Sequence, residues 1–274
     1  MPELPEVETI VRDLAPLLTG RRFVRATLSH DDLLRGISGP QLVQALAGRT
    51  VDGLSRRAKH AVIRLGRDRL VVQPGMSGSL QVHTAPLTAA EAKYAVLRVQ
   101  LDDSRELVYR DVRRLGTLLL LDEAEWQAYD LHLGREPLDP AFTAEEFHAQ
   151  LAGSKQAVKK LLMDQRLVVG IGNIYANEAL FAAGIDPSKP GTGVGLPRAA
   201  RLLAESRRIL QAAIDNRGTT FRDYRTGTGG KGEFVDFLKV YGREGEPCVA
   251  CGTRLAGTHE IDARATVFCH RCQT

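Results

Sequence analysis

The chain opens with MPELPEVE, residues 1–8, and this stretch predicts a helix start next to a reactive chain end. Pro5 suits the first turn of a helix, and the acidic residues after it suit the positive end of the helix dipole. Apolar residues then recur at helical spacing until Gly20: Val7, Ile10, Val11, Leu14 and Leu18. The helix accounts for Pro5 onward but gives no reason for Pro2-Glu3.

Pro2 offers a chemical role for the chain end. An initiator Met followed by Pro is normally removed, which would leave Pro2 with a free secondary amine. An α-amino group titrates near ~7.7 to 8.0, so about a tenth is unprotonated at neutral pH, and desolvation raises that share. Attack of this amine on the C1′ atom of a sugar would form a permanently charged iminium ion. Glu3 could protonate the sugar ring oxygen or stabilise the cation.

Charge is spread unevenly along the chain. The 274 residues hold 37 Lys and Arg against 33 Asp and Glu, and a net charge of +4 is weak evidence for a nucleic acid partner. Residues 55–70 hold six basic side chains against one acidic, and residues 198–231 hold eight against three, so each segment carries +5. Two such basic segments favour a polyanionic binding partner. Without a signal peptide or an apolar run of ~18 residues, we expect a cytoplasmic protein with no membrane span.

Short segments rich in Val, Leu and Ile alternate with turn residues in the first part of the chain. Eight such segments, with only short helices near residues 40–47, predict an antiparallel β-sandwich with flanking helices. We expect residues 1–130 to form this domain. The expected strands are 22–28, 50–54, 61–65, 70–73, 79–83, 95–101, 106–110 and 117–121.

The pattern changes after residue 130. Residues 131–142 lose periodicity and gain Gly and Pro, which indicates a hinge linker. Residues 143–234 are expected to form a helical domain, in which 217–232 are too rich in glycine for a regular element and predict a mobile loop. Residues 235–274 are expected to form a separate small domain. The expected helices are 143–151, 154–164, 173–183 and 197–216.

The four cysteines all lie in this last domain and predict a metal site. Cys248-x-x-Cys251 and Cys269-x-x-Cys272, seventeen residues apart, have the spacing of a four-thiolate zinc site with a β-hairpin between the pairs. A closed four-cysteine site has no open coordination position, so the Zn²⁺ would be structural. The hairpin carries Arg264, which becomes a candidate phosphate ligand.

Three further loops could contact a duplex. Gly172-Asn173 forms a glycine turn before a helix, where backbone N–H groups can bind phosphate, although a plain helix start is the simpler reading. It lacks the preceding strand and third glycine of a dinucleotide site, so no nucleotide cofactor is expected. Met76 between glycines could enter a base stack, or could belong to the core. Arg113 and Leu115 in another inter-strand loop suit a gap in a duplex.

Taken together, these segments resemble the formamidopyrimidine-DNA glycosylases, bacterial bifunctional enzymes that remove 8-oxoguanine and ring-opened purines. The resemblance runs from end to end, and its motifs in this order are highly specific. They are PELPEVET at 2–9, RAK at 57–59, GMSGSL at 75–80, LMD at 162–164, GNIYA at 172–176, VYGR at 240–243, and the four-cysteine finger with RAT at 264–266.

The resemblance implies a fold and a reaction. It implies an α+β protein in which a β-sandwich is hinged to a helix-two-turn-helix domain with a zinc finger, acting as a monomer on damaged double-stranded DNA in the bacterial nucleoid. Pro2 would form a Schiff base and Glu3 would help open the sugar. Lys59 would transfer a proton in β-elimination and contact a phosphate, and Arg264 would serve δ-elimination and bind phosphate.

The resemblance also implies DNA contacts. Asn173 and Tyr241 would bind the DNA backbone, and residues 217–234 would cap the extruded base. A wedge of Met76, Arg113 and Leu115 would fill the space that this base leaves.

The sequence departs from the family at some of these positions. Leu115 stands where the family more often has Phe, so we expect weaker interrogation of the opposite base. Val112 replaces a frequent Pro. Tyr94 replaces a DNA-contacting His, which makes that contact an open question.

Two other functions compete with this one. The endonuclease VIII branch shares the amine-and-Glu start and the finger but prefers oxidised pyrimidines. Leu4, the Gly-Met-Ser-Gly loop and the long glycine-rich segment favour the purine branch. A non-catalytic zinc-ribbon DNA-binding protein would use the finger alone and would leave Pro2 without a chemical role.

Overall fold

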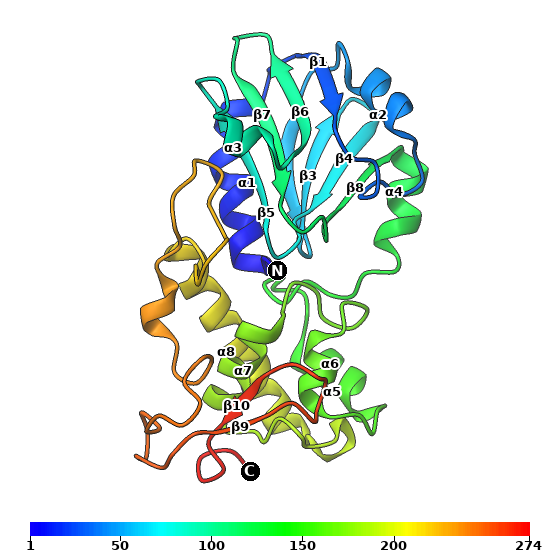
Figure 1. The fold of residues 1–274 in the computed structure, drawn as a ribbon. Helices are drawn as coiled ribbons and strands as arrows, with labels where there is room; N and C mark the ends of the chain where they lie inside the picture. The colour runs from blue at the N-terminus through cyan, green and yellow to red at the C-terminus, as the bar shows by residue number, and fades with distance from the viewer. The chain divides into compact units, whose positions relative to one another are not determined.

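The computed structural model describes residues 1–274, which divide into two units (Figure 1). The first unit comprises residues 1–131 and 216–235, and the second comprises residues 132–215 and 236–274. None of the helices combines the length and the apolar character that a bilayer crossing requires.

The first unit is an antiparallel β-sandwich, as predicted. One sheet has the order β1-β6-β7-β5 and the other has the order β2-β3-β4-β8, with every neighbouring pair antiparallel. All eight expected strands are present, with ends shifted by at most three residues. They are β1 Phe23–Leu28, β2 Gly53–Arg57, β3 His60–Leu65, β4 Asp68–Gln73, β5 Gly78–His83, β6 Ala95–Leu101, β7 Glu106–Asp111 and β8 Thr117–Leu121.

Helix α1, Leu4–Leu18, packs its apolar stripe on the core of this sandwich, as its periodicity predicts. Val7, Ile10 and Leu14 are fully buried among strand residues, and burial of each such side chain contributes about 1.5 to 3 kcal/mol. Helix α2, Gly39–Leu46, closes another part of the core. The start of α1 is therefore fixed against the sandwich, and with it the residues that precede the helix.

Two short helices were not predicted. Helix α3 is Ala89–Ala92, and helix α4 is Glu123–Asp130. Neither helix buries a residue, so neither has the apolar periodicity by which a helix is recognised in sequence. Helix α4 depends on its cap instead, because the Asp122 side chain accepts a hydrogen bond from the Glu125 N–H at 2.9 Å.

The second unit is helical, with a small hairpin near the chain's end. Its α-helices are α5 Ala144–Ala152, α6 Val158–Met163, α7 Asn173–Ala183 and α8 Leu196–Asp215; η1 Gly191–Gly193 and η2 Phe234–Phe237 are single 3₁₀ turns, η2 beginning in the first unit. The hairpin pairs β9 Ala256–Thr258 with β10 Thr266–Phe268. Helix α6 is shorter than the expected 154–164, because Ala157 has a non-helical backbone and forms a bridge with Pro190 instead.

Residues 216–235 lie with the first unit, whereas residues 217–234 were expected in the helical domain. This segment has no regular secondary structure apart from a bridge between Thr219 and Glu233. The segment is bound to α1 by hydrogen bonds to the side chains of Glu6 and Asp13. Such long-range contacts leave no periodic signal in the sequence.

Candidate active site

The residues before α1 are held in place by the helix start. Pro2 and Glu3 are buried, whereas Met1 is about half exposed. Glu3 is the N-cap of α1: its carbonyl accepts the Val7 N–H at 3.1 Å and its own N–H donates to Glu6 Oε2 at 2.8 Å. The backbone of Pro2 and Glu3 is thus anchored to a buried helix instead of fraying as chain ends usually do.

The terminal amine shares its surroundings with two of the predicted catalytic residues. Burial lowers the pKa of the Met1 amine, and the charges of Lys59 and Arg113 lower it further, while Glu3 and Glu6 raise it. These four side chains therefore lie close enough to the amine to interact with it electrostatically. A lowered pKa enlarges the neutral, nucleophilic share of an amine at neutral pH.

Lys59 lies in the tight turn between β2 and β3 and is almost fully buried. Ala58 before it has φ +54°, the left-handed conformation that two-residue hairpin turns require at their first central position. His60 supports the turn, since its Nδ1 lies 3.0 Å from the Arg57 carbonyl and its Nε2 lies 3.0 Å from the Tyr129 hydroxyl. Burial lowers the pKa of His60, which keeps the ring neutral. No sequence pattern indicated this supporting role of His60.

The predicted wedge residues lie on two exposed loops of the same unit. Met76 and Leu115 have exposed fractions of 44% and 57%, and Arg113 is exposed as well. Val112, next to Arg113, is not one of the predicted wedge residues but is also exposed, at 50%. The loops touch, because a Cβ added at Gly75 would lie 2.9 Å from the carbonyl carbon of Leu115. A cluster of exposed apolar side chains on adjoining loops is unusual for a free surface and fits insertion into another molecule.

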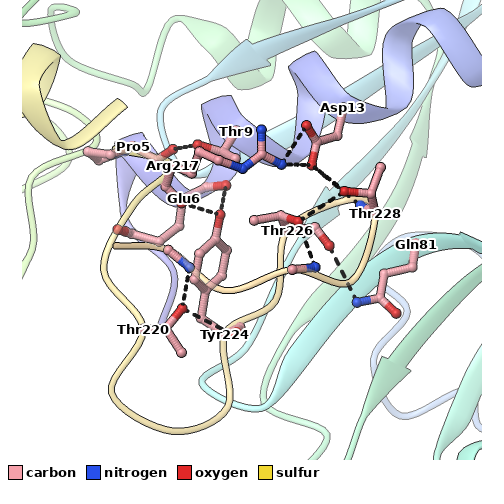
Figure 2. A network of polar contacts seen from close by, with 12 residues as sticks. Pro5, Glu6, Thr9, Asp13, Gln81, Arg217, Thr220, Tyr224, Thr226 and Thr228 are labelled. Atoms are coloured by element: carbon pink, nitrogen blue, oxygen red, sulfur yellow. Dashed lines mark hydrogen bonds and ion pairs between the residues drawn. The ribbon is translucent and has the colours of Figure 1, made fainter. Parts of the chain in front are cut away.

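The glycine-rich segment packs on α1 through a polar network (Figure 2). The Thr219 N–H donates to Glu6 Oε1 at 2.8 Å, and the Tyr224 hydroxyl donates to the Glu6 carbonyl at 3.2 Å. The Arg217 guanidinium pairs with Asp13 at 2.7 Å, and Thr228 donates to the same carboxylate at 3.2 Å. Glu6 therefore links the residues before α1 to this segment. In sequence it was interpreted only as an acidic residue at a helix start.

The predicted contacts of the second unit gather around α7. Asn173, the first residue of α7, donates from Nδ2 to the Ala265 carbonyl at 3.0 Å, next to the exposed Arg264. The Tyr241 N–H donates to the buried Glu178 carboxylate on α7 at 2.8 Å, as do the N–H groups of residues 239 and 240. Helix α7 thus fixes both the finger hairpin and the segment that carries Tyr241.

The four cysteines form a compact cluster that suits a tetrahedral metal ion. Their sulfur atoms all lie within 4.8 Å of one another; Cys248 and Cys272 are 3.9 Å apart, and Cys251 and Cys269 are 3.5 Å apart. A Zn–S bond of about 2.3 Å in a tetrahedron requires sulfur separations of about 3.8 Å. The donor set and its dimensions therefore fit the expected zinc, and no fifth ligand is needed.

Comparison with known proteins assigns the family. The model of the formamidopyrimidine-DNA glycosylase N-terminal domain matches residues 1–118, and that of the formamidopyrimidine-DNA glycosylase H2TH domain matches residues 133–225. The chain belongs to the formamidopyrimidine-DNA glycosylase family. It is 43% identical to the formamidopyrimidine-DNA glycosylase of Acidithiobacillus ferrooxidans over 273 residues, all of both chains. The family assignment confirms the resemblance drawn from the sequence.

Solved structures of this glycosylase family share the fold. The wild-type Lactococcus lactis Fpg (MutM), in complex with an N7-benzyl-Fapy-dG containing DNA, superposes with a TM-score of 0.91 at 32% identity over all of both chains. The MutM (Fpg) protein from Thermus thermophilus superposes with a TM-score of 0.87 at 35% identity, over 99% of this chain and 98% of its own. The chain is thus a DNA repair glycosylase of this family, with the predicted sandwich, helical domain and cysteine cluster.

Proposed function

We propose that this glycosylase excises oxidised purines from double-stranded DNA and then nicks the strand as an AP lyase, with the amine of Pro2 as nucleophile. The observation that carries the proposal is the buried chain end, where burial lowers the pKa of the terminal amine beside Glu3 and Lys59. Removal of Met1 would transfer the same desolvation to the secondary amine of Pro2. An amine of lowered pKa is the activated nucleophile that Schiff-base chemistry requires.

The reaction begins with a nucleotide turned out of the duplex, because C1′ cannot be attacked within the stack. The Pro2 amine displaces the damaged base at C1′, and protonation of the ring oxygen by Glu3 opens the sugar to leave a Pro2–C1′ iminium. The iminium acidifies the C2′ hydrogen. Loss of that proton expels the 3′ phosphate, and a second elimination expels the 5′ phosphate. Lys59 is assigned the first proton transfer and Arg264 the second elimination.

Binding of the duplex is assigned to the exposed loops of the first unit and to basic and polar side chains. Met76, Arg113 and Leu115 would occupy the gap left by the extruded nucleotide and offset part of its unstacking cost of a few kcal/mol. Lys59, Asn173, Tyr241 and Arg264 would contact the phosphate backbone. We assign a DNA contact to Tyr94 as well; this residue is half-buried and directly precedes β6. Residues 217–234 would cover the extruded base.

We assign one structural Zn²⁺ to Cys248, Cys251, Cys269 and Cys272. The ion, when bound, would cross-link the two cysteine pairs and so hold the hairpin that carries Arg264. The cysteines would contribute no step of the reaction, because four thiolates complete the tetrahedron.

We assign oxidised purines as the substrate class because of the family and because of two segments, the Gly-Met-Ser-Gly loop and the long glycine-rich segment. Related structures hold DNA that contains Fapy-dG, carbocyclic 8-oxo-G or an abasic site. One related Lactococcus lactis structure holds an oxidised pyrimidine, so pyrimidine excision is the alternative to test. Cleavage rates on duplexes with 8-oxoguanine opposite cytosine and with thymine glycol discriminate the two, and faster thymine glycol cleavage would overturn the purine assignment.

The experiment for the nucleophile is borohydride trapping, because borohydride reduces the iminium to a stable protein–DNA adduct. The protein is prepared with a removable N-terminal extension and compared before and after cleavage to a Pro2 end. We expect an adduct only from the cleaved protein, and acylation of its new amine should abolish the adduct. Equal trapping by the extended protein would exclude Pro2, and no trapping by either form would favour a non-catalytic DNA binder.

A further inference from the structure

Asp111, at the end of β7, is a carboxylate that the proposed reaction does not use. It is only 1% exposed. A buried carboxylate is stable only when donors surround it, so its partners show what the residue organises. Those partners come from both wedge loops.

The two oxygen atoms of Asp111 bind different loops. Oδ1 accepts the Ser77 hydroxyl at 2.7 Å, and Ser77 follows Met76 directly. Oδ2 accepts the Gly116 N–H at 2.8 Å, and Gly116 follows Leu115 directly. The carboxylate therefore bridges the residues next to the two apolar side chains of the wedge.

Tyr109 adds a third donor from within β7. Its hydroxyl donates to Asp111 Oδ2 at 3.2 Å, and the ring is fully buried. Burial and the negative charge of Asp111 both raise the pKa of Tyr109, so the phenol stays protonated and remains a donor. The carboxylate thus has a donor that no change of pH in the physiological range removes.

Further hydrogen bonds extend the bridge to the other predicted DNA contacts of the first unit. Ser77 Oγ accepts the Arg113 N–H at 2.9 Å, so Asp111 reaches Arg113 through a single hydroxyl. The Asp111 N–H donates to the Tyr94 carbonyl at 3.1 Å. Three segments that are far apart in sequence therefore meet at one residue.

Two glycines make this arrangement tight. A Cβ added at Gly75 would lie 2.6 Å from Asp111 Oδ2 and 2.7 Å from the Gly116 nitrogen, and a Cβ at Gly116 would overlap the Tyr109 hydroxyl. Real Cβ atoms do not approach so closely. Both positions need glycine because the loops close around the carboxylate.

We propose that Asp111 is a positioning residue that locks the Met76 loop and the Arg113–Leu115 loop into one preformed wedge. Met76 and Leu115 are largely exposed and gain little packing of their own, so hydrogen bonds to Asp111 set their arrangement. A preformed wedge loses less conformational entropy on insertion into the duplex. This inference rests on the proposed glycosylase function, and Asp111 touches no reacting atom.

The test compares a reaction that needs the wedge with one that does not. In Asp111→Asn, an amide N–H₂ replaces one acceptor and faces a donor. We expect excision of 8-oxoguanine from a duplex to fall about 10- to 100-fold. The rate of nicking at an abasic site in single-stranded DNA should change less than about 2-fold, because no base stack has to be filled there. The fluorescence rise of a 2-aminopurine beside the lesion, which reports unstacking, should fall with the excision rate.

Two further variants keep the test decisive. Ser77→Ala removes only the hydroxyl bridge and is expected to lose about 3- to 10-fold on the duplex alone. Asp52→Asn is the matched control, since Asp52 accepts the Gly66 N–H at 2.6 Å in a loop without wedge residues, and both of its rates should stay at wild type. The inference would be overturned if Ser77→Ala and Asp111→Asn lowered the duplex excision rate and the single-strand nicking rate equally. It would also be overturned if neither variant changed the rate of excision from the duplex. A wild-type protein that does not nick abasic sites would instead refute the proposed function.

Discussion

Removal of the Asp13 carboxylate should release the glycine-rich segment from α1 while the fold stays intact. In the structure, Asp13 accepts Arg217 at 2.7 and 3.0 Å and the Thr228 hydroxyl at 3.2 Å. The Asp13 side chain is 11% exposed and that of Arg217 is 45% exposed, so solvent weakens the ion pair to about 0.2 to 1 kcal/mol. The hydroxyl bond to a charged group adds about 1.5 kcal/mol.

Asp13→Ala is therefore expected to favour opening of residues 217–232 by about 1.7 to 2.5 kcal/mol, which is about a 20- to 70-fold change in the opening equilibrium. Hydrogen exchange with mass spectrometry of the free protein measures this change directly. Exchange in the segment should accelerate by that factor, while exchange in the strands and the melting temperature stay nearly constant.

Glu8→Ala is the matched control for this prediction. Glu8 lies on the same helix and pairs with Arg12 and Arg56 at 2.8 and 3.0 Å, but it makes no hydrogen bond to the segment. The control should leave exchange in 217–232 unchanged. If Asp13→Ala does not accelerate that exchange, or if both variants do so equally, Asp13 does not anchor the segment.

Three further predictions concern the chemistry and its supports. Burial lowers the pKa of the Met1 amine, and the buried Pro2 amine that removal of Met1 would free should be desolvated likewise. The rate of borohydride trapping should therefore rise with pH with a midpoint below 8.0, and a midpoint at or above 8.0 contradicts this. Lys59→Ala and Arg264→Ala should each reduce the slope of log affinity against log salt by about 1, whereas an unchanged slope removes that residue from the phosphate contacts. Cys269→Ala, or removal of zinc by a chelator, should expose residues 247–274 to limited proteolysis and leave the melting of the sandwich nearly unchanged; a protease-resistant finger without metal would argue against structural zinc.

Local sequence patterns determined most of the architecture. Short segments rich in Val, Leu and Ile, separated by turn residues, identified all eight strands, because sandwich strands bury apolar side chains and the chain must turn between them. Helical spacing identified α1, α7 and α8, and the cysteine spacing identified the cluster whose sulfur atoms the structure brings within 4.8 Å. Pro2 and Glu3 were singled out because an imino acid and a carboxylate at the chain end have a chemistry of their own. Each of these signals is read from one continuous stretch of the chain, and the longest, Cys248 to Cys272, covers 25 residues.

The tertiary structure alone decided how distant residues cooperate. Glu6 and Asp13 bind a segment more than 200 positions away, and this contact places residues 216–235 in the first unit. Asp111 joins two loops, and nothing in their sequences indicates that one carboxylate holds both. Helix α4 buries nothing and so left no periodicity to read. Hydrogen bonds between remote polar groups form only where folding brings those groups together. The sequence contains both partners but does not show that they become neighbours.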